Sequence, residues 1–212
     1  MIRALLVDDQ PLIRQGLKAI FEATGKISVI GEAGSGKEAL TAVLRLNPDV
    51  VCMDIRMPEG DGIWATSEIQ KLNDPPAVIV ITTFDLDEYV FGALEAGACG
   101  VLLKDSPMDV LVEGVTRAAS GEGLVDAALT RRVIAEFGRR KTRAVTDPKE
   151  LTPREIDCVR ALGQGLSNIE IGQKLFLEPS TVKTHLSSAM AKVGVTSRVQ
   201  LVIWAFRAGV VS

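Results

Sequence analysis

Four places in the first half of the chain carry side chains that could act together on a phosphate or a metal ion. Asp8 and Asp9, Asp54, Thr82 and Lys104 each follow a short apolar run. Taken singly, each is an ordinary polar loop residue. Together they lie at the ends of four expected strands, the edge at which open α/β sheets bind ligands. Three close carboxylates repel one another unless a cation lies among them, and hard oxygen ligands at an incompletely enclosed site favour Mg²⁺.

The elements that must position these residues alternate between strands and helices. The strands are nearly continuous apolar runs, as in a parallel sheet covered on both faces, and are expected at Ile2–Val7, Val29–Ala33, Val50–Met53, Ala77–Ile81 and Gly100–Leu103. Helical patterns lie between them, near residues 11–24, 36–46, 60–73, 87–96 and 108–120. Five such repeats predict an α/β doubly wound five-stranded parallel sheet over residues 1–121.

The charges divide the chain into two halves of opposite sign. Residues 1–121 hold ten Lys/Arg and eighteen Asp/Glu, whereas residues 122–212 hold fourteen and nine. The basic half is therefore the candidate for binding nucleic acid. Three distant cysteines argue against a disulfide framework and for a reducing compartment. A single histidine argues against a zinc site or a Ser-His-Asp triad.

No apolar run reaches the length that spans a membrane, and Met1 leads directly into a strand-like segment. We therefore expect a cytoplasmic protein with no membrane partner.

The residues at the predicted sheet edge resemble the receiver domain of two-component response regulators, over about residues 1–121. The resemblance is carried by Asp8-Asp9, Met53-Asp54-Ile55-Arg56-Met57-Pro58-Glu59-Gly60-Asp61-Gly62, Thr82 and Leu103-Lys104. It implies that Asp54 accepts a phosphoryl group from a sensor histidine kinase. It also implies that Asp9, Asp54 and the backbone carbonyl of Arg56 hold Mg²⁺, with Asp8 acting through a water. Lys104 would pair with the phosphoryl oxygens, and the Thr82 hydroxyl would hydrogen-bond to one of them.

The physical chemistry agrees with these roles. A carboxylate is already a competent nucleophile, so this transfer needs charge neutralisation and in-line positioning and no general base. A glycine-rich segment from Gly31 through Gly36-Lys37 imitates a phosphate-binding P-loop. That motif requires Ser or Thr next, and Glu38 stands there instead, where its carboxylate would repel phosphates. We interpret this segment as an ordinary strand-to-helix turn.

The sequence departs from the receiver pattern in three places. Val101 stands three residues before the lysine, where many receivers carry an aromatic side chain whose rotamer follows the switch. Switching must then depend more on Thr82 and on backbone shifts. Asp105 replaces the proline that often follows the lysine, which weakens the expectation of a cis peptide. Arg56 and Phe84 are bulky residues that flank the water path, so we expect a long-lived phosphoryl-aspartate; a half-life of seconds at neutral pH would contradict this.

Beyond residue 121 the pattern changes to short, well-capped helices. Residues 122–148 are expected to form a helical linker, with a helix near 126–140 that ends in a basic run. Residues 149–212 are expected to form a small all-α four-helix domain. Thr152-Pro153-Arg154-Glu155 and Ser167-Asn168-Ile169-Glu170 both have the capping-box pattern. Helices at 167–175 and 179–193, three residues apart, have the spacing of a helix-turn-helix.

The helix at 179–193 has an apolar stripe and a polar face. The stripe, which should face the core, consists of Val182, Leu186, Ala189 and Val193. The residues that point elsewhere are short or cationic, as a helix in the major groove requires, and are Lys183, Thr184, Ser187 and Ser188. Three flanking residues suit phosphate contacts, namely Thr181, His185 and Lys192. A merely solvated face is the alternative interpretation.

The second half also resembles a known family, the LuxR-type helix-turn-helix, over about residues 149–212. The resemblance runs from Leu151-Thr152-Pro153-Arg154-Glu155 through Gly165–Ile171 to Thr181–Leu186. With the receiver, the layout resembles the NarL/FixJ class, in which the third helix reads the groove and the fourth supports dimerisation. This implies that Lys183 and Thr184, then Ser187, contact base edges. Val199, Ile203 and Trp204 would line a dimer face, although core packing explains them equally well.

The expected function is a DNA-binding transcriptional regulator of a two-component system. It would be no enzyme beyond Mg²⁺-dependent self-phosphorylation and autodephosphorylation. The unphosphorylated receiver is expected to mask the DNA-binding domain or to leave it monomeric. Phosphorylation of Asp54 would release that domain or promote a homodimer that binds double-stranded promoter DNA, with RNA polymerase as a further partner. One alternative is an enzyme with an aspartyl-phosphate intermediate, but no segment supplies its second carboxylate or its substrate cap. The other is a regulator that senses a small molecule, which an Asp54→Asn variant with a normal response would favour.

Overall fold

The computed structural model describes residues 1–57, 62–83, 88–123 and 150–211, and the chain divides into two compact units, Met1–Leu124 and Val125–Ser212. All but the first two residues of the predicted linker at 122–148 lie outside the described residues, and so does the helix predicted near 126–140. Within the described segments, no helix has both the length and the apolar character needed to cross a membrane.

The first unit contains the predicted five-stranded parallel sheet. Its strands are β1 (Ile2–Val7), β2 (Ile27–Ala33), β3 (Val50–Met53), β4 (Ala77–Thr82) and β5 (Gly100–Leu103). The strand order is β2-β1-β3-β4-β5, and every pairing is parallel. The order reverses between β1 and β3, so the loops after these two central strands open onto the same crevice. The predicted doubly wound α/β fold is confirmed.

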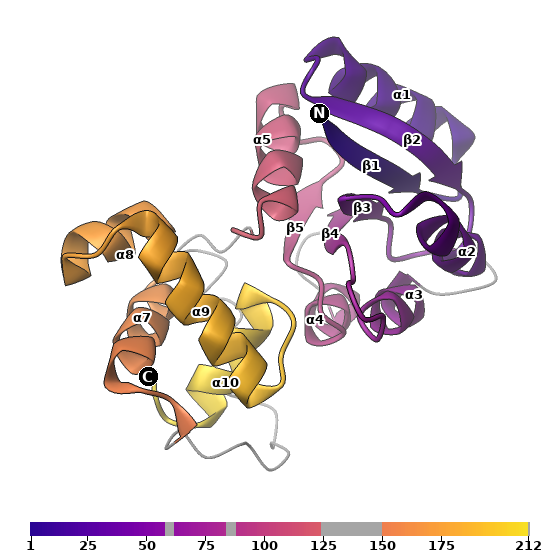
Figure 1. The fold of residues 1–212 in the computed structure, drawn as a ribbon. Helices are drawn as coiled ribbons and strands as arrows, with labels where there is room; N and C mark the ends of the chain where they lie inside the picture. The colour runs from indigo at the N-terminus through magenta and orange to yellow at the C-terminus, as the bar shows by residue number, and fades with distance from the viewer. Residues whose placement is uncertain (58–61, 84–87, 124–149, 212) are drawn as a thin grey trace. The chain divides into compact units, whose positions relative to one another are not determined.

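Helices cover both faces of this sheet (Figure 1). On one face, α1 (Pro11–Ala23) and α5 (Met108–Ala119) pack against Ala4 and Leu6 of β1. On the other, α2 (Gly36–Leu46) and α3 (Gly62–Ile69) pack against Leu5 and Val7. Alternate residues of one strand thus enter two separate cores, which explains the nearly continuous apolar runs. Helix α4 (Glu88–Glu95) packs beside α3.

Two elements differ from their predicted bounds by more than one residue, each for a local reason. Strand β2 begins at Ile27, two residues earlier than predicted, and its pairing with β1 shifts register between Ala4 and Leu5. Helix α3 ends at Ile69, whereas the prediction extended it to residue 73. After Ile69 the amides of Lys71 and Leu72 bond to the carbonyls three residues back, so a tighter turn replaces the last helical turn.

The second unit is a small helical domain, as predicted. Its described helices are α7 (Pro153–Gly163), α8 (Asn168–Leu175), α9 (Pro179–Val193) and α10 (Arg198–Arg207). Thr152, Ser167 and Ser197 each form a complete capping box, whereas Glu178 makes no side-chain cap on α9. The predicted stripe of α9 is buried, namely Val182, Leu186, Ala189 and Val193. These contacts hold α9 against α7 and α8.

Candidate functional site

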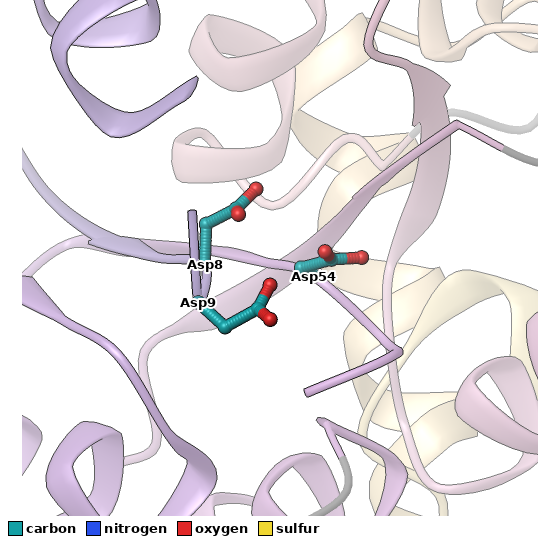
Figure 2. Close-up of side chains that lie close together, drawn as sticks. All are labelled: Asp8, Asp9 and Asp54. Carbon is teal, nitrogen blue, oxygen red and sulfur yellow. The ribbon is translucent and has the colours of Figure 1, made fainter. Parts of the chain in front are cut away.

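Three carboxylates converge where β1 and β3 end (Figure 2). Asp8 and Asp9 follow β1 and Asp54 follows β3, and these strands are neighbours in the sheet. One oxygen from each carboxylate lies within 4.8 Å of the other two. Asp8 is 3% exposed and Asp54 6% exposed. Charges buried this closely need a counter-ion.

Lys104 supplies part of that counter-charge. Its Nζ lies 2.5 Å from Asp8 Oδ2 and 2.7 Å from Asp54 Oδ2. Its amide donates to the carbonyl of Thr82 at 2.8 Å, so the pairing of β5 with β4 delivers the ammonium to the site. Burial disfavours the ammonium, but the hydrogen bonds with Asp54 and Asp8 outweigh burial and raise the pKa of Lys104. The ammonium therefore stays charged at neutral pH.

The Asp54 carboxylate is incompletely compensated. Burial raises its pKa, and the hydrogen bond and charge of Lys104 oppose that shift without cancelling it. Its Oδ1 accepts the amide of Ile55 at 2.7 Å. One ammonium shared between Asp54 and Asp8 leaves this cluster with more negative than positive charge. The site therefore favours a further cation.

The donor set fits a hard divalent cation. Asp9 Oδ1 is buried and accepts no hydrogen bond from any residue that the structure describes, which is costly unless a ligand satisfies it. Asp8 Oδ1 accepts the amide of Gln10 at 2.9 Å, which orients the carboxylate. An all-oxygen set that remains partly open is the environment that Mg²⁺ prefers, because this ion retains several waters.

The remaining predicted receiver residues lie around this cluster. Thr82 is buried at the end of β4, and Val101 is half-buried on the neighbouring β5. The exposed guanidinium of Arg56 lies 4.6 Å from the centre of the Tyr89 ring, on α4. This stack joins the loop after β3 to α4. Phe84, the other residue predicted to flank the water path, lies outside the described residues.

The glycine-rich segment does not form a phosphate cradle. Gly31 belongs to β2, where an added Cβ would lie 2.5 Å from Leu46 Cδ1. The Glu38 carboxylate accepts the amide of Gly34 at 2.8 Å. This contact places a negative charge on one of the amides that would otherwise face a phosphate. The interpretation as a strand-to-helix turn agrees with these contacts.

The predicted base-contacting residues lie on one exposed side of α9. Lys183, Thr184 and Ser187 are exposed, and Thr181 and His185 are half-buried beside them. The Thr184 hydroxyl donates to the carbonyl of Ser180 at 3.0 Å, which leaves its oxygen able to accept a further bond. A short polar side of this kind can approach the floor of a major groove.

Two other polar residues of α9, the half-buried Ser188 and the exposed Lys192, make contacts within the domain. Lys192 Nζ lies 2.8 Å from Glu155 Oε2, and Ser188 Oγ donates to Glu155 Oε1 at 2.6 Å. Glu155 is on α7 and is 4% exposed. Lys192 was predicted to contact phosphate and Ser188 to lie on the polar face. In the structure, both bind a buried carboxylate of the same domain.

The predicted dimer residues are part of the core of their own domain. Val199, Ile203 and Trp204 are all buried along α10. Helix α10 packs against α7 and α9. Core packing, the alternative interpretation, accounts for this burial within a single chain. The dimer face stays a prediction.

The two units match two sequence families. The response regulator receiver domain family matches residues 4–116, and the bacterial regulatory proteins of the luxR family match residues 149–205. The chain belongs to the two-component response regulators. LiaR of Bacillus subtilis, a transcriptional regulatory protein, is 37% identical over 207 residues, which cover 98% of each chain. The nitrate/nitrite response regulator NarL of Escherichia coli K12 is 32% identical over 200 residues, 94% of this chain and 93% of NarL.

A solved response regulator has the same layout. The crystal structure of ChrA, from a heme-sensing two-component system, matches with a TM-score of 0.54 and 33% identity over 99% of this chain and 98% of ChrA. The two family matches and this likeness agree: the chain has a receiver domain followed by a LuxR-type DNA-binding domain. The predicted membership of the NarL-type regulators is confirmed.

Sequence reasoning missed two residues that order the acidic site of this response regulator. Arg14 donates to the carbonyl of Asp8 at 2.6 Å and to Glu32 at 3.1 Å, which fixes the corner between β1 and α1. Tyr89 stacks on Arg56 from α4. The one available signal for Arg14 was its place six residues after Asp8, early in a helix that follows the strand. Nothing in the sequence pointed to Tyr89.

Proposed function

We propose that this response regulator is switched by phosphorylation of Asp54 and that its phosphorylated form dimerises on promoter DNA. The single observation that carries the proposal is the buried Asp54 carboxylate, with Asp8 and Asp9 beside it and the Lys104 ammonium at 2.7 Å. A nucleophile, a counter-ion and oxygen ligands for a metal thus share one crevice.

In the proposed reaction, an Asp54 oxygen attacks the phosphorus of a phosphohistidine on the sensor kinase. The new O–P bond forms as the N–P bond breaks, and the imidazole leaves and takes up a proton. Mg²⁺, held by Asp9, Asp54 and the carbonyl of Arg56 with Asp8 as an outer ligand, would neutralise charge on the phosphoryl oxygens.

The chain's own residues then accommodate the product. Lys104 exchanges its bond to Asp54 for one to a phosphoryl oxygen, because formation of the acyl phosphate leaves the old acceptor with less charge. The hydroxyl of Thr82, at the end of the adjacent β4, donates to another phosphoryl oxygen. Because Val101 offers no aromatic rotamer, we propose that the change reaches the rest of the receiver through Thr82 and the backbone between β4 and α4.

The output follows from the second domain. Lys183 and Thr184, with Ser187, would contact base edges from α9, and Thr181 and His185 would contact phosphates. Two domains bound to adjacent half-sites gain avidity that one domain lacks, so dimerisation on phosphorylation would raise DNA affinity. RNA polymerase is then the partner on which the bound dimer acts, and the protein works in the cytoplasm.

The test is phosphorylation of the purified chain by a small phosphoryl donor such as acetyl phosphate, with and without Mg²⁺. We expect intact mass spectrometry to find one phosphoryl group on the wild type, an increase in solution mass toward a dimer, and tighter binding to a duplex enriched from a random-sequence pool. Asp54→Asn should abolish all three responses. Asp105→Asn, at an exposed carboxylate just after Lys104, is the matched control and should retain them. A phosphorylated Asp54→Asn variant, or turnover of an external phosphoester, would contradict the proposal.

A further inference from the structure

The recognition helix α9 is fixed by a polar cluster that includes no predicted DNA contact except Lys192. Glu155 of α7 accepts bonds from Ser188 and Lys192 of α9. Ser188 and Lys192 are four residues apart, so a single carboxylate holds two successive turns of α9. Glu155 also accepts the amide of Thr152 at 2.7 Å and thereby completes the capping box of α7.

The polar cluster fixes the rotation and axial position of α9 more narrowly than the apolar stripe can. Apolar contacts at Val182, Leu186, Ala189 and Val193 decide which side of α9 faces the core, but they tolerate a small rotation or shift along the axis. Hydrogen bonds to one buried carboxylate depend on distance and direction, so they fix both the rotation of the helix and its position along its axis. The exposed Lys183 and Thr184 lie about two turns before Lys192 on the same rigid helix.

We propose that Glu155 is the positioning residue of the recognition helix and that Lys192 acts through Glu155, not through DNA phosphate. The inference rests on the proposed function, because it takes α9 as the element that reads DNA. The Lys192 side chain is 35% exposed, but its ammonium contacts both oxygens of Glu155, at 3.0 and 2.8 Å. An ammonium that left them for a phosphate would abandon a carboxylate that is 4% exposed. That exchange would leave a buried charge with too few partners.

The two roles of Lys192 differ in the salt dependence of DNA binding. Each lysine that neutralises a phosphate adds about 0.9 to the slope of log affinity against log salt concentration. A lysine that only positions the helix adds nothing to this slope. Its loss instead lowers affinity for the preferred sequence more than affinity for other DNA, because base contacts depend on helix position and backbone attraction does not.

The experiment measures the affinity of the full-length chain for two probes at several salt concentrations. One probe is a duplex enriched by the wild type from a random-sequence pool, and the other is a mixed-sequence duplex of the same length. The variants are Lys192→Met, which keeps the length of the side chain, Glu155→Gln and their double variant. Lys183→Met is the matched comparison, because Lys183 is an exposed lysine of the same helix that is predicted to contact DNA. Circular dichroism checks that each variant keeps its helices.

We expect Lys192→Met to leave the salt slope unchanged on both probes and to lower affinity for the enriched duplex about tenfold, as loss of a charged hydrogen bond implies. Lys183→Met removes a cation that is predicted to contact the DNA itself, so it should lower the salt slope. In the Glu155→Gln background, Lys192→Met should lower affinity for the enriched duplex much less than it does in the wild type, since the partner charge of Lys192 is already absent. Lys192→Arg, which keeps a cation within reach of Glu155, should restore most of the lost affinity.

A fall of about 0.9 in the slope with Lys192→Met, or an equal cost of that change with and without Glu155, would overturn the inference. Unchanged preference for the enriched duplex in both Lys192→Met and Glu155→Gln would overturn it as well. If Glu155→Gln does not fold, the slope of Lys192→Met decides alone. A pool in which the wild type enriches no sequence would contradict the proposed function instead, and the slopes on mixed-sequence DNA would still distinguish the two roles of Lys192.

Discussion

Removal of the Lys104 charge is the most direct perturbation of the acidic site. Lys104→Met keeps the length of the side chain but takes away the ammonium that lies between Asp8 and Asp54. Both carboxylates are then buried without that partner. The change tests whether Lys104 is the counter-ion of this site, which is the premise of its exchange onto a phosphoryl oxygen.

The loss of stability expected from Lys104→Met follows from the burial of the two carboxylates. Removing one partner of a buried ion pair costs roughly 3–5 kcal/mol, because an uncompensated charge remains. Since burial already raises the pKa of Asp54, part of this cost is relieved as the carboxyl group takes up a proton, so we expect about 3 kcal/mol at neutral pH and less as the pH falls. For a domain of this size that corresponds to a melting temperature roughly 10 °C lower.

Mg²⁺ should then stabilise the variant more than the wild type, because no ammonium competes for Asp8 and Asp54. Ligand at a hundred times its dissociation constant adds about 2.7 kcal/mol of stability, enough to offset most of the loss. Melting can be followed by the fluorescence of Trp64 on α3 in a Trp204→Phe background, so that the receiver is observed by itself.

Lys18→Met is the matched control. Lys18 is 41% exposed and lies 3.6 Å from Glu32, a surface pair worth at most about 1 kcal/mol. If Lys104→Met melts as close to the wild type as Lys18→Met does, or if Mg²⁺ stabilises the Lys104 variant and the wild type equally, Lys104 is not the counter-ion and the reasoning fails.

Two further predictions concern the backbone near Asp54 and the polar cluster of α9. Gly62→Ala should destabilise the receiver by roughly 1–3 kcal/mol in urea unfolding, because the new Cβ would lie 2.1 Å from the carbonyl oxygen of Asp54. Gly16→Ala is the control and should be neutral or stabilising, because its Cβ would meet no described atom within 4 Å beyond its chain neighbours and its own helix backbone. Burial opposes the charge of Glu155, but hydrogen bonds from Lys192, Ser188 and Thr152 outweigh it and lower its pKa to about 2. The folded-state pKa is thus depressed, so the stability that the Glu155 carboxylate contributes should be complete above about pH 4.5 and lost as pH falls toward 2. Glu155→Gln should remove that part of the loss of stability in acid. A variant whose melting temperature falls with pH as the wild type's does would refute this prediction.

The sequence predicted what depends on local pattern. The apolar runs predicted the bounds of β1, β3 and β5 that the structure shows, because strands buried on both faces must be apolar throughout. The capping boxes at Thr152 and Ser167 located two helices, since the polar side chains and amides that form them lie within one turn. The gathering of Asp8, Asp9 and Asp54 followed from parallel topology, which brings the carboxyl ends of strands to one edge.

What the sequence did not predict are contacts between distant polar residues. Lys192 and Ser188 bind Glu155 across 37 and 33 residues, and on a helical projection they look like members of an exposed face. Glu155 was correctly assigned to a capping box, but a carboxylate has two oxygens and can serve a second helix as well. Periodicity assigns a residue to a side of a helix and gives no information on which neighbouring element covers that side.

The two domains each bury a carboxylate beside a lysine, and the difference between these clusters accounts for the different roles that we propose for them. Glu155 receives bonds from Lys192, Ser188 and Thr152, and these outweigh burial, so its pKa falls. Asp54 shares one ammonium with Asp8 and has its pKa raised by burial. A fully compensated charge has nothing to gain from a new ligand and can serve as a fixed point for a helix. An under-compensated charge gains from a cation and can exchange its partner, which is what a reversible switch requires. The donors around each carboxylate therefore distinguish the cluster that we propose reacts from the cluster that we propose positions α9.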